Sequence, residues 1–205
     1  MKEFEYLRTY SIKKYVPFTG AVFGVLIFAF AVLSLMQSQV SYPELTNSLI
    51  DASSIGCSSS NPIGSTCGYF LHNSSISLIA WLGGFAIIGP FYILWENGMN
   101  IGSYIGTAIT DPDSLHGWDT TVEALAFLIP HGIIEIPAII ISCSLGIYIA
   151  ETILNHRTNM EDYDVLATFK ETAPYAILVI GMLGIAAFIE ANISVQFAKF
   201  VGGMF

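Results

Sequence analysis

Long stretches of apolar residues constrain this chain more than any other feature of its sequence. Residues 16–35 contain no charged side chain, and largely apolar regions also cover residues 77–109, 122–150 and 174–197. A helix of about 20 apolar residues crosses the roughly 30 Å hydrocarbon core of a bilayer. The sequence therefore predicts an all-α fold, a polytopic bundle of about five membrane segments, some of them broken or short.

Charged residues are too scarce for an ordinary soluble surface. They make up 11% of the 205 residues, whereas 54% are hydrophobic, and soluble domains carry about 25% charged residues. The formal net charge of −9 argues against nucleic acid, which is bound through clustered Lys and Arg. The partner that the composition indicates is the lipid bilayer.

The basic residues indicate an orientation. Four of the seven bases lie in the first 15 residues, namely Lys2, Arg8, Lys13 and Lys14. Since cytoplasmic segments of membrane proteins are enriched in Lys and Arg, we expect residues 1–15 to form a cytoplasmic amino-terminal segment. Residues 16–205 would then form a single transmembrane domain in the cell membrane.

A hydrophilic loop is expected at residues 37–73, because this stretch is rich in Ser, Asn, Gly and Pro. It contains no Lys or Arg, so the same rule places it outside. Cys57 and Cys67 both fall in this loop. They can form a disulfide in an oxidising compartment, and two free thiols are the alternative.

Glycine and proline divide the later apolar regions. We expect one helix over residues 75–95 and a shorter one to residue 109, on which Gly98, Gly102 and Gly106 recur every fourth residue. Small residues in this register allow two membrane helices to pack closely.

The long region 122–150 contains Pro130 and Pro137 and is expected to be kinked or split. If the short helix before it spans, there are five crossings and the carboxyl terminus is outside. Four crossings would place Arg157 and Lys170 outside instead, an arrangement that the distribution of bases disfavours.

Four ionisable residues inside the apolar regions carry the functional signal: Glu96, His131, Glu135 and Glu190. Charged groups at membrane depth usually face the bundle interior, a partner or water. His131 and Glu135 are four residues apart and so share one helix face. Either the carboxyls hold protons, or a cation joins them. His131 and Glu135 are the candidate ligands for a divalent cation such as zinc or manganese; a structural hydrogen bond between them is the alternative.

The same residues resemble the stage II sporulation protein M family of membrane proteins. The resemblance rests on residues 72–102, a Gly-rich apolar helix that ends in Asn97-Gly98, and on the Pro-His-Gly-x-x-Glu segment at 130–135. Glu190 in the last helix also matches the family pattern. The resemblance implies a multi-helix membrane protein, and the named member belongs to a membrane complex with cell-wall hydrolases during engulfment in spore-forming bacteria.

Two functions follow as hypotheses. The first is a non-enzymatic scaffold or membrane-complex subunit, self-associating as a homo-oligomer through its glycine faces. The second is a cation or small-solute transporter, or permease subunit, that uses the intramembrane Glu and His residues. An intramembrane enzyme has the least support, since the sequence contains no nucleophile elbow, Walker loop or HExxH motif. We therefore expect no enzymatic activity.

Overall fold

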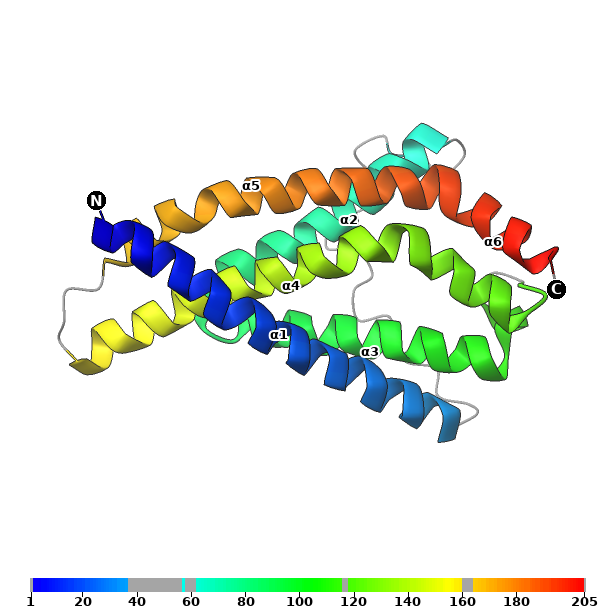
Figure 1. The fold of residues 1–205 in the computed structure, drawn as a ribbon, viewed down its shortest axis with the longest axis horizontal. Coiled ribbons are helices and arrows are strands. Elements are labelled where there is room, and N and C mark those ends of the chain that lie inside the picture. Colours follow the sequence, from blue (N-terminus) through cyan, green and yellow to red (C-terminus); the bar gives the residue numbers. More distant parts are fainter. Residues whose placement is uncertain (1, 37–56, 58–61, 116–117, 160–163, 205) are drawn as a thin grey trace.

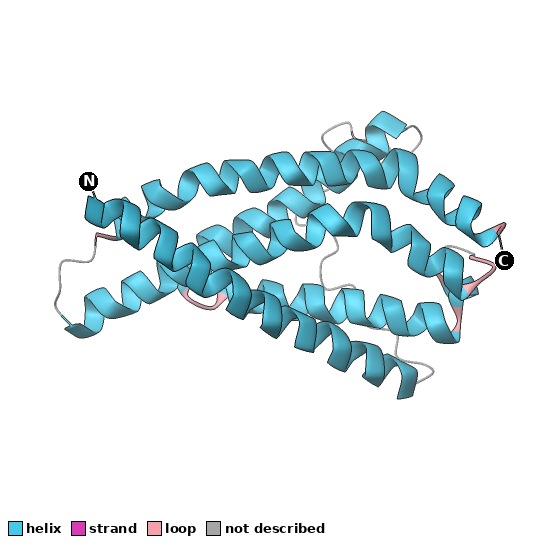
Figure 2. Cartoon of the chain, viewed as in Figure 1, coloured by secondary structure: helices cyan, strands magenta, loops and turns pink. Residues whose placement is uncertain are grey.

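The fold is a bundle of long helices. The computed structural model describes residues 2–36, 57, 62–115, 118–159 and 164–204. Within these residues the regular structure is helical and includes no strand (Figure 2). The predicted all-α class is thereby confirmed. In chain order the helices are α1 (Lys2–Met36), α2 (Pro62–Leu82), α3 (Gly89–Thr110), α4 (Thr121–Asn159), α5 (Val165–Ile189) and the short α6 (Val195–Gly202).

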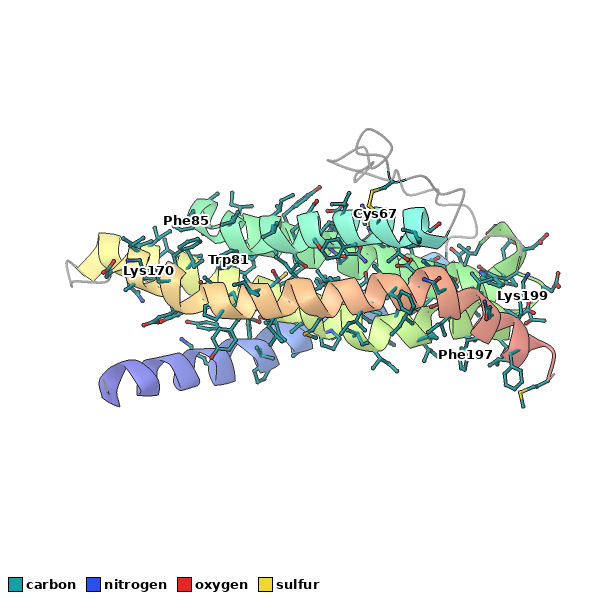
Figure 3. The ribbon with its side chains drawn as sticks, turned by 90° about the horizontal axis from the view of Figure 1, so that it is seen from above. Cys67, Trp81, Phe85, Lys170, Phe197 and Lys199 are labelled. Carbon is teal, nitrogen blue, oxygen red and sulfur yellow. A yellow bond between two sulfur atoms is a disulfide. The ribbon has the colours of Figure 1, made fainter. Side chains whose placement is uncertain are left out.

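The helices run back and forth along one long axis, so that each of α1 to α5 points opposite to the helix before it and α6 continues the direction of α5 (Figure 1). The amino terminus lies at one end of this axis and the carboxyl terminus at the other. Figure 3 places Phe85 and Lys170 toward the first end, and Cys67 and Lys199 toward the second. We refer to these as the amino-terminal end and the carboxyl-terminal end of the bundle.

Three helical segments in the described residues are long and apolar enough to cross a membrane: Lys14–Met36, Thr121–Asn155 and Val165–Gly202. The segment on α4 is the central helix of the bundle. In its most apolar stretch 56% of the residues are buried, compared with 22% in the α1 segment and 28% in the segment at Val165–Gly202. Helices α2 and α3, with 21 and 22 residues, are long enough but less apolar, and both pack along α4 within the bundle.

The expected helix over residues 75–95 is wrong, because the chain reverses direction inside it. Helix α2 ends at Leu82, a short 3₁₀ turn spans Gly83–Ala86, and α3 begins at Gly89. Gly83 and Gly89 pack backbone to backbone, so that a Cβ on Gly83 would lie 2.8 Å from the Cα of Gly89. Only glycine allows so tight a reversal.

The hydrophilic loop is shorter than expected. Residues 62–73 belong to α2, whose first residue is Pro62. Proline suits the first position of a helix, where its missing N–H would have no partner. The remainder of the loop lies outside the described residues except for Cys57, which forms a disulfide with Cys67 of α2. At least two polar residues of this stretch have contacts within the bundle, since Asn73 is buried and Thr66 accepts a hydrogen bond from Asn192.

Helix α4 stays continuous through Pro130 and Pro137, so it is not split. Figure 1 shows that it bends in its first half, and proline accounts for such a bend because it removes a backbone hydrogen bond and crowds the preceding turn. The helix start is capped as a Thr-x-x-Glu sequence would be. The backbone N–H of Glu123 donates to Thr120 Oγ1 at 3.2 Å.

Helices α1 and α3 form the most extensive pair in the bundle, and the repeated glycines lie in their contact. A Cβ on Gly98 would lie 2.7 Å from Leu26 Cβ, and one on Gly102 would lie 2.5 Å from the backbone oxygen of Ile27. A Cβ on Gly106 would overlap Ser34 in the same way. The glycine face is therefore occupied within the chain.

Candidate functional site: an intramembrane His-Glu-Glu cluster

His131, Glu135 and Glu190 come together between α4 and the end of α5. One ligand atom from each side chain, an imidazole nitrogen or a carboxylate oxygen, lies within 4.8 Å of the other two. His131 is buried and the two glutamates are partly buried. Glu190 lies more than 50 positions after His131 and Glu135 in the sequence. The cluster therefore joins the two segments Thr121–Asn155 and Val165–Gly202, which are long and apolar enough to span a membrane. It is referred to below as the His-Glu-Glu cluster.

Helix geometry explains two of the three members. His131 and Glu135 are four residues apart on α4, so both side chains leave the helix on the same face. That face meets α5 and the segment that follows it, since α4 packs against both. Pro130 precedes His131 directly within α4.

The third member lies on a widened helical turn. Residues Glu190–Ser194 form a π-helical segment between α5 and α6. Such segments are rare, and they occur frequently at functional sites because the extra residue redirects side chains. Here the widened turn places Glu190 at its first position and Ser194 at its last, and both face α4.

Ser194 holds the imidazole of His131 in place. Its Oγ lies 3.0 Å from Nδ1 of His131, and the serine is fully buried. The same hydroxyl donates to the backbone oxygen of Ile189 at 3.4 Å. A neutral imidazole that donates from Nδ1 to this hydroxyl would keep the Nε2 lone pair available as a metal ligand.

The charges of the cluster match a divalent cation. Two carboxylates and a neutral imidazole carry a formal charge of −2, and nitrogen and oxygen ligands of this kind suit zinc or manganese. Two ligands on a tetrahedral zinc ion lie about 3.3–3.6 Å apart, closer than the 4.8 Å within which the ligand atoms of this cluster lie. Small rotations of the glutamate side chains would close the site around an ion.

A cavity of about 600 Å³ leads from the carboxyl-terminal end of the bundle toward the cluster. Glu190 and Phe127 line it, and the Phe127 ring contacts the His131 imidazole with ring centroids 5.4 Å apart. Asp119 and Lys199 also line the cavity, and Figure 3 places Lys199 near the carboxyl terminus. Three carboxyl groups, of Asp119, Glu123 and Glu190, and the ammonium group of Lys199 therefore line the cavity between the end of the bundle and the cluster.

Helix α2 closes the cluster from another side. Tyr69 of α2 lines the same cavity as Glu190. One turn earlier, Thr66 Oγ1 accepts a hydrogen bond from Asn192 Nδ2 at 3.2 Å, which ties α2 to the π-helical turn. The Cys57–Cys67 disulfide lies on the neighbouring residue of α2.

Glu96, the fourth ionisable residue selected from the sequence, is not a member of this cluster. It lies on α3 and is almost completely buried. Ser194, in contrast, is a site residue that the sequence reasoning missed. No spacing rule identifies it in the sequence, because Glu190–Ser194 form a π-helical turn, in which residues four apart do not share a face as they do in an α-helix.

Comparisons with known proteins give one family and one distant relative. A family model described as stage II sporulation protein M matches residues 18–195, a range that contains the whole His-Glu-Glu cluster. An uncharacterized protein of Methanocaldococcus jannaschii is 36% identical over 81 residues, which cover 38% of each chain. The match thus spans well under half of that relative. No solved structure matches the chain.

Proposed function

The chain belongs to the stage II sporulation protein M family, and for it we propose a function in moving a divalent cation across the cell membrane, as a transporter or permease subunit. The convergence of His131, Glu135 and Glu190 within 4.8 Å carries this proposal. Burying three ionisable groups inside spanning helices costs free energy unless the groups bind a solute or interact with one another. Packing alone would not require them to meet.

The cavity supports transport rather than a purely structural ion. It begins beside Asp119 and Lys199 at the carboxyl-terminal end and reaches Glu190, so a cation has a route to the cluster from one side. Helices broken or widened at the binding site are common in transporters, where they line the solute path. The π-helical turn at residues 190–194 is an irregularity of that kind.

The proposed topology has the amino terminus in the cytoplasm and five membrane segments, with α2 and α3 as the more polar ones. The alternating helices and the opposite positions of the chain ends support five segments (Figure 1). Lys14 and Lys170 lie toward the amino-terminal end of the bundle, and positive residues favour the cytoplasmic side. The cavity would then open to the exterior.

The proposal is tested by measuring metal binding and metal-ion uptake with the same preparation of the protein. The purified protein is stripped with chelator, loaded with Zn²⁺ or Mn²⁺, and analysed for bound metal; the same protein in liposomes is assayed with an entrapped metal indicator. The variants are Glu135→Gln and Glu190→Gln. Glu96→Gln is the matched control, because it removes a buried glutamate that is outside the cluster.

We expect about one bound ion per chain and measurable uptake in the parent protein. Both signals should fall to background in Glu135→Gln and Glu190→Gln and persist in Glu96→Gln, with all variants eluting as the parent does in size-exclusion chromatography. Absence of flux in the parent would refute transport. Metal binding that survives both cluster substitutions would refute the site itself.

A non-enzymatic subunit of a membrane complex is the second candidate, and one observation favours it. Gly24 of α1 has open space around it, with no atom within 4 Å of a Cβ built there. Val25 and Phe28 beside it are 67% and 71% exposed. This surface around Gly24 offers a small-residue contact to another membrane helix.

A photo-crosslinker placed at Phe28 tests this second candidate in native membranes. A protein partner or a second copy should be captured, and the additional substitution Gly24→Leu should abolish the capture. A crosslinker at Phe188 of α5, 54% exposed, is the control. Equal capture from both positions, or none from Phe28, would contradict a specific contact through α1.

A further inference from the structure

We propose that a groove between α1, α4 and α5 binds the acyl chain of a membrane phospholipid. The groove encloses about 280 Å³, and all of its lining residues come from these three helices. It lies toward the amino-terminal end of the bundle and shares no lining residue with the cavity below the His-Glu-Glu cluster. The inference is independent of the proposed cation function.

The position of the groove identifies what it faces. Its three helices are the three that are long and apolar enough to cross a membrane. Helices α1 and α5 diverge along the bundle with α4 between them (Figure 1). A groove between diverging spanning helices opens sideways into the bilayer, so the molecules available to fill it are lipids.

The groove has a hydrophobic floor and an outer rim. Leu145 of α4 forms part of the floor and is 3% exposed, whereas Leu178 of α5 is 55% exposed at the rim. An unfilled groove of this kind leaves side chains without van der Waals partners on one side. An acyl chain supplies those contacts.

The surface that the groove presents is apolar, as an acyl chain requires. Glu171 lies seven residues before Leu178 on α5, a distance of about 10 Å along a helix. Tyr15 lines the groove near the beginning of the spanning part of α1. The end of the groove near Tyr15 and Glu171, called its polar end below, is therefore the end toward the membrane surface.

Lys14 provides a contact for the phosphate. Its Nζ donates to Glu151 Oε1 at 3.0 Å and to the Tyr15 hydroxyl at 3.1 Å. An ammonium group has three donors, so one remains, and the side chain is 49% exposed. A phosphate oxygen above the polar end of the groove can accept that third hydrogen bond.

Two measurements test the lipid site. The first is native mass spectrometry of the protein purified in a mild detergent with a defined phosphatidylglycerol added. One lipid per chain should remain bound, and Ser144→Phe, which places a ring in the groove, should remove it. Lys14→Gln should weaken retention several-fold, because the phosphate loses its donor.

The second measurement does not require a variant that fills the groove. Leu178→Trp is compared with Ile177→Trp, whose side chain is 71% exposed on α5 and does not line the groove. Brominated phospholipid in detergent should quench the added fluorescence of Leu178→Trp at a lipid concentration several-fold below that needed for Ile177→Trp.

Two results would overturn the proposal. Equal quenching at both positions together with no retained lipid would show that detergent and lipid exchange freely over this surface. A dimer that crosslinks through a benzophenone at position 178 would show that a second copy of the chain covers the groove instead.

Discussion

Nδ1 of His131 lies 3.0 Å from Oγ of Ser194, and this contact joins the face of α4 that carries Glu135 to the π-helical turn that begins with Glu190. The serine hydroxyl also lies 3.4 Å from the backbone oxygen of Ile189, so contacts on two sides position it against the imidazole. A metal ligand whose second nitrogen is held in this way keeps its free nitrogen directed at the ion.

Ser194→Ala should weaken metal binding by roughly 10–100-fold, because outer-shell partners of ligating histidines contribute on that scale. Competition with a fluorescent zinc chelator measures the affinity. Ser74→Ala is the control, since Ser74 is another buried serine but lies on α2 outside the cluster. An unchanged affinity in Ser194→Ala would show that the hydroxyl does not position His131.

Gly102→Ala should destabilise the bundle by about 1–3 kcal/mol, the usual consequence of adding a methyl group to a packed contact. The new Cβ would meet the backbone oxygen of Ile27 at 2.5 Å, and backbone cannot rotate away as a side chain can. The thermal unfolding midpoint in detergent reports the change. Gly24→Ala, with open space at the same type of position, should leave the midpoint unchanged or slightly raised. Equal midpoints for the two variants would contradict close packing of α1 on α3.

Reduction of the Cys57–Cys67 disulfide should lower stability by about 2–3 kcal/mol, because the closed loop of ten residues loses its constraint on the unfolded chain. The midpoint of thermal unfolding with and without reductant measures this effect. A maleimide should label neither residue before reduction and both afterwards. Cys143, which is fully buried, should stay unlabelled in the folded protein. Labelling of Cys57 and Cys67 without reductant would contradict the disulfide.

Lys170→Cys and Lys199→Cys should be labelled from opposite sides of the membrane. Both side chains are exposed, and they lie toward opposite ends of the bundle (Figure 3). A membrane-impermeant thiol reagent applied to intact cells should modify position 199, and it should modify position 170 only after permeabilisation. Modification of position 170 alone in intact cells would reverse the proposed orientation.

The sequence predicts the membrane bundle because apolar length and helical hydrogen bonding leave few alternatives in a bilayer. It also pairs His131 with Glu135, since that relationship depends only on helical spacing. The reversal at Gly83 was missed because the apolar pattern of residues 77–95 continues across it. Hydropathy reports burial and lipid contact, and it does not record where the chain turns inside the bundle.

The complete cluster required tertiary information. Glu190 and Glu96 look alike in the sequence, since both are single glutamates in apolar surroundings. Only the packing of α5 on α4 distinguishes them, by bringing Glu190 to His131 and leaving Glu96 on α3. The π-helical turn has no recognisable sequence signature, so the position of Ser194 beside His131 could not be derived from spacing.

X-ray absorption spectroscopy at the zinc edge, on the purified protein loaded with one Zn²⁺ per chain, shows whether His131 and the two glutamates hold the ion. We predict a first shell of one imidazole nitrogen and oxygen ligands at about 2.0–2.2 Å, with the imidazole signal lost in His131→Ala. A shell that contains sulfur, or one that retains its imidazole signal in His131→Ala, would contradict a cation site built from His131, Glu135 and Glu190.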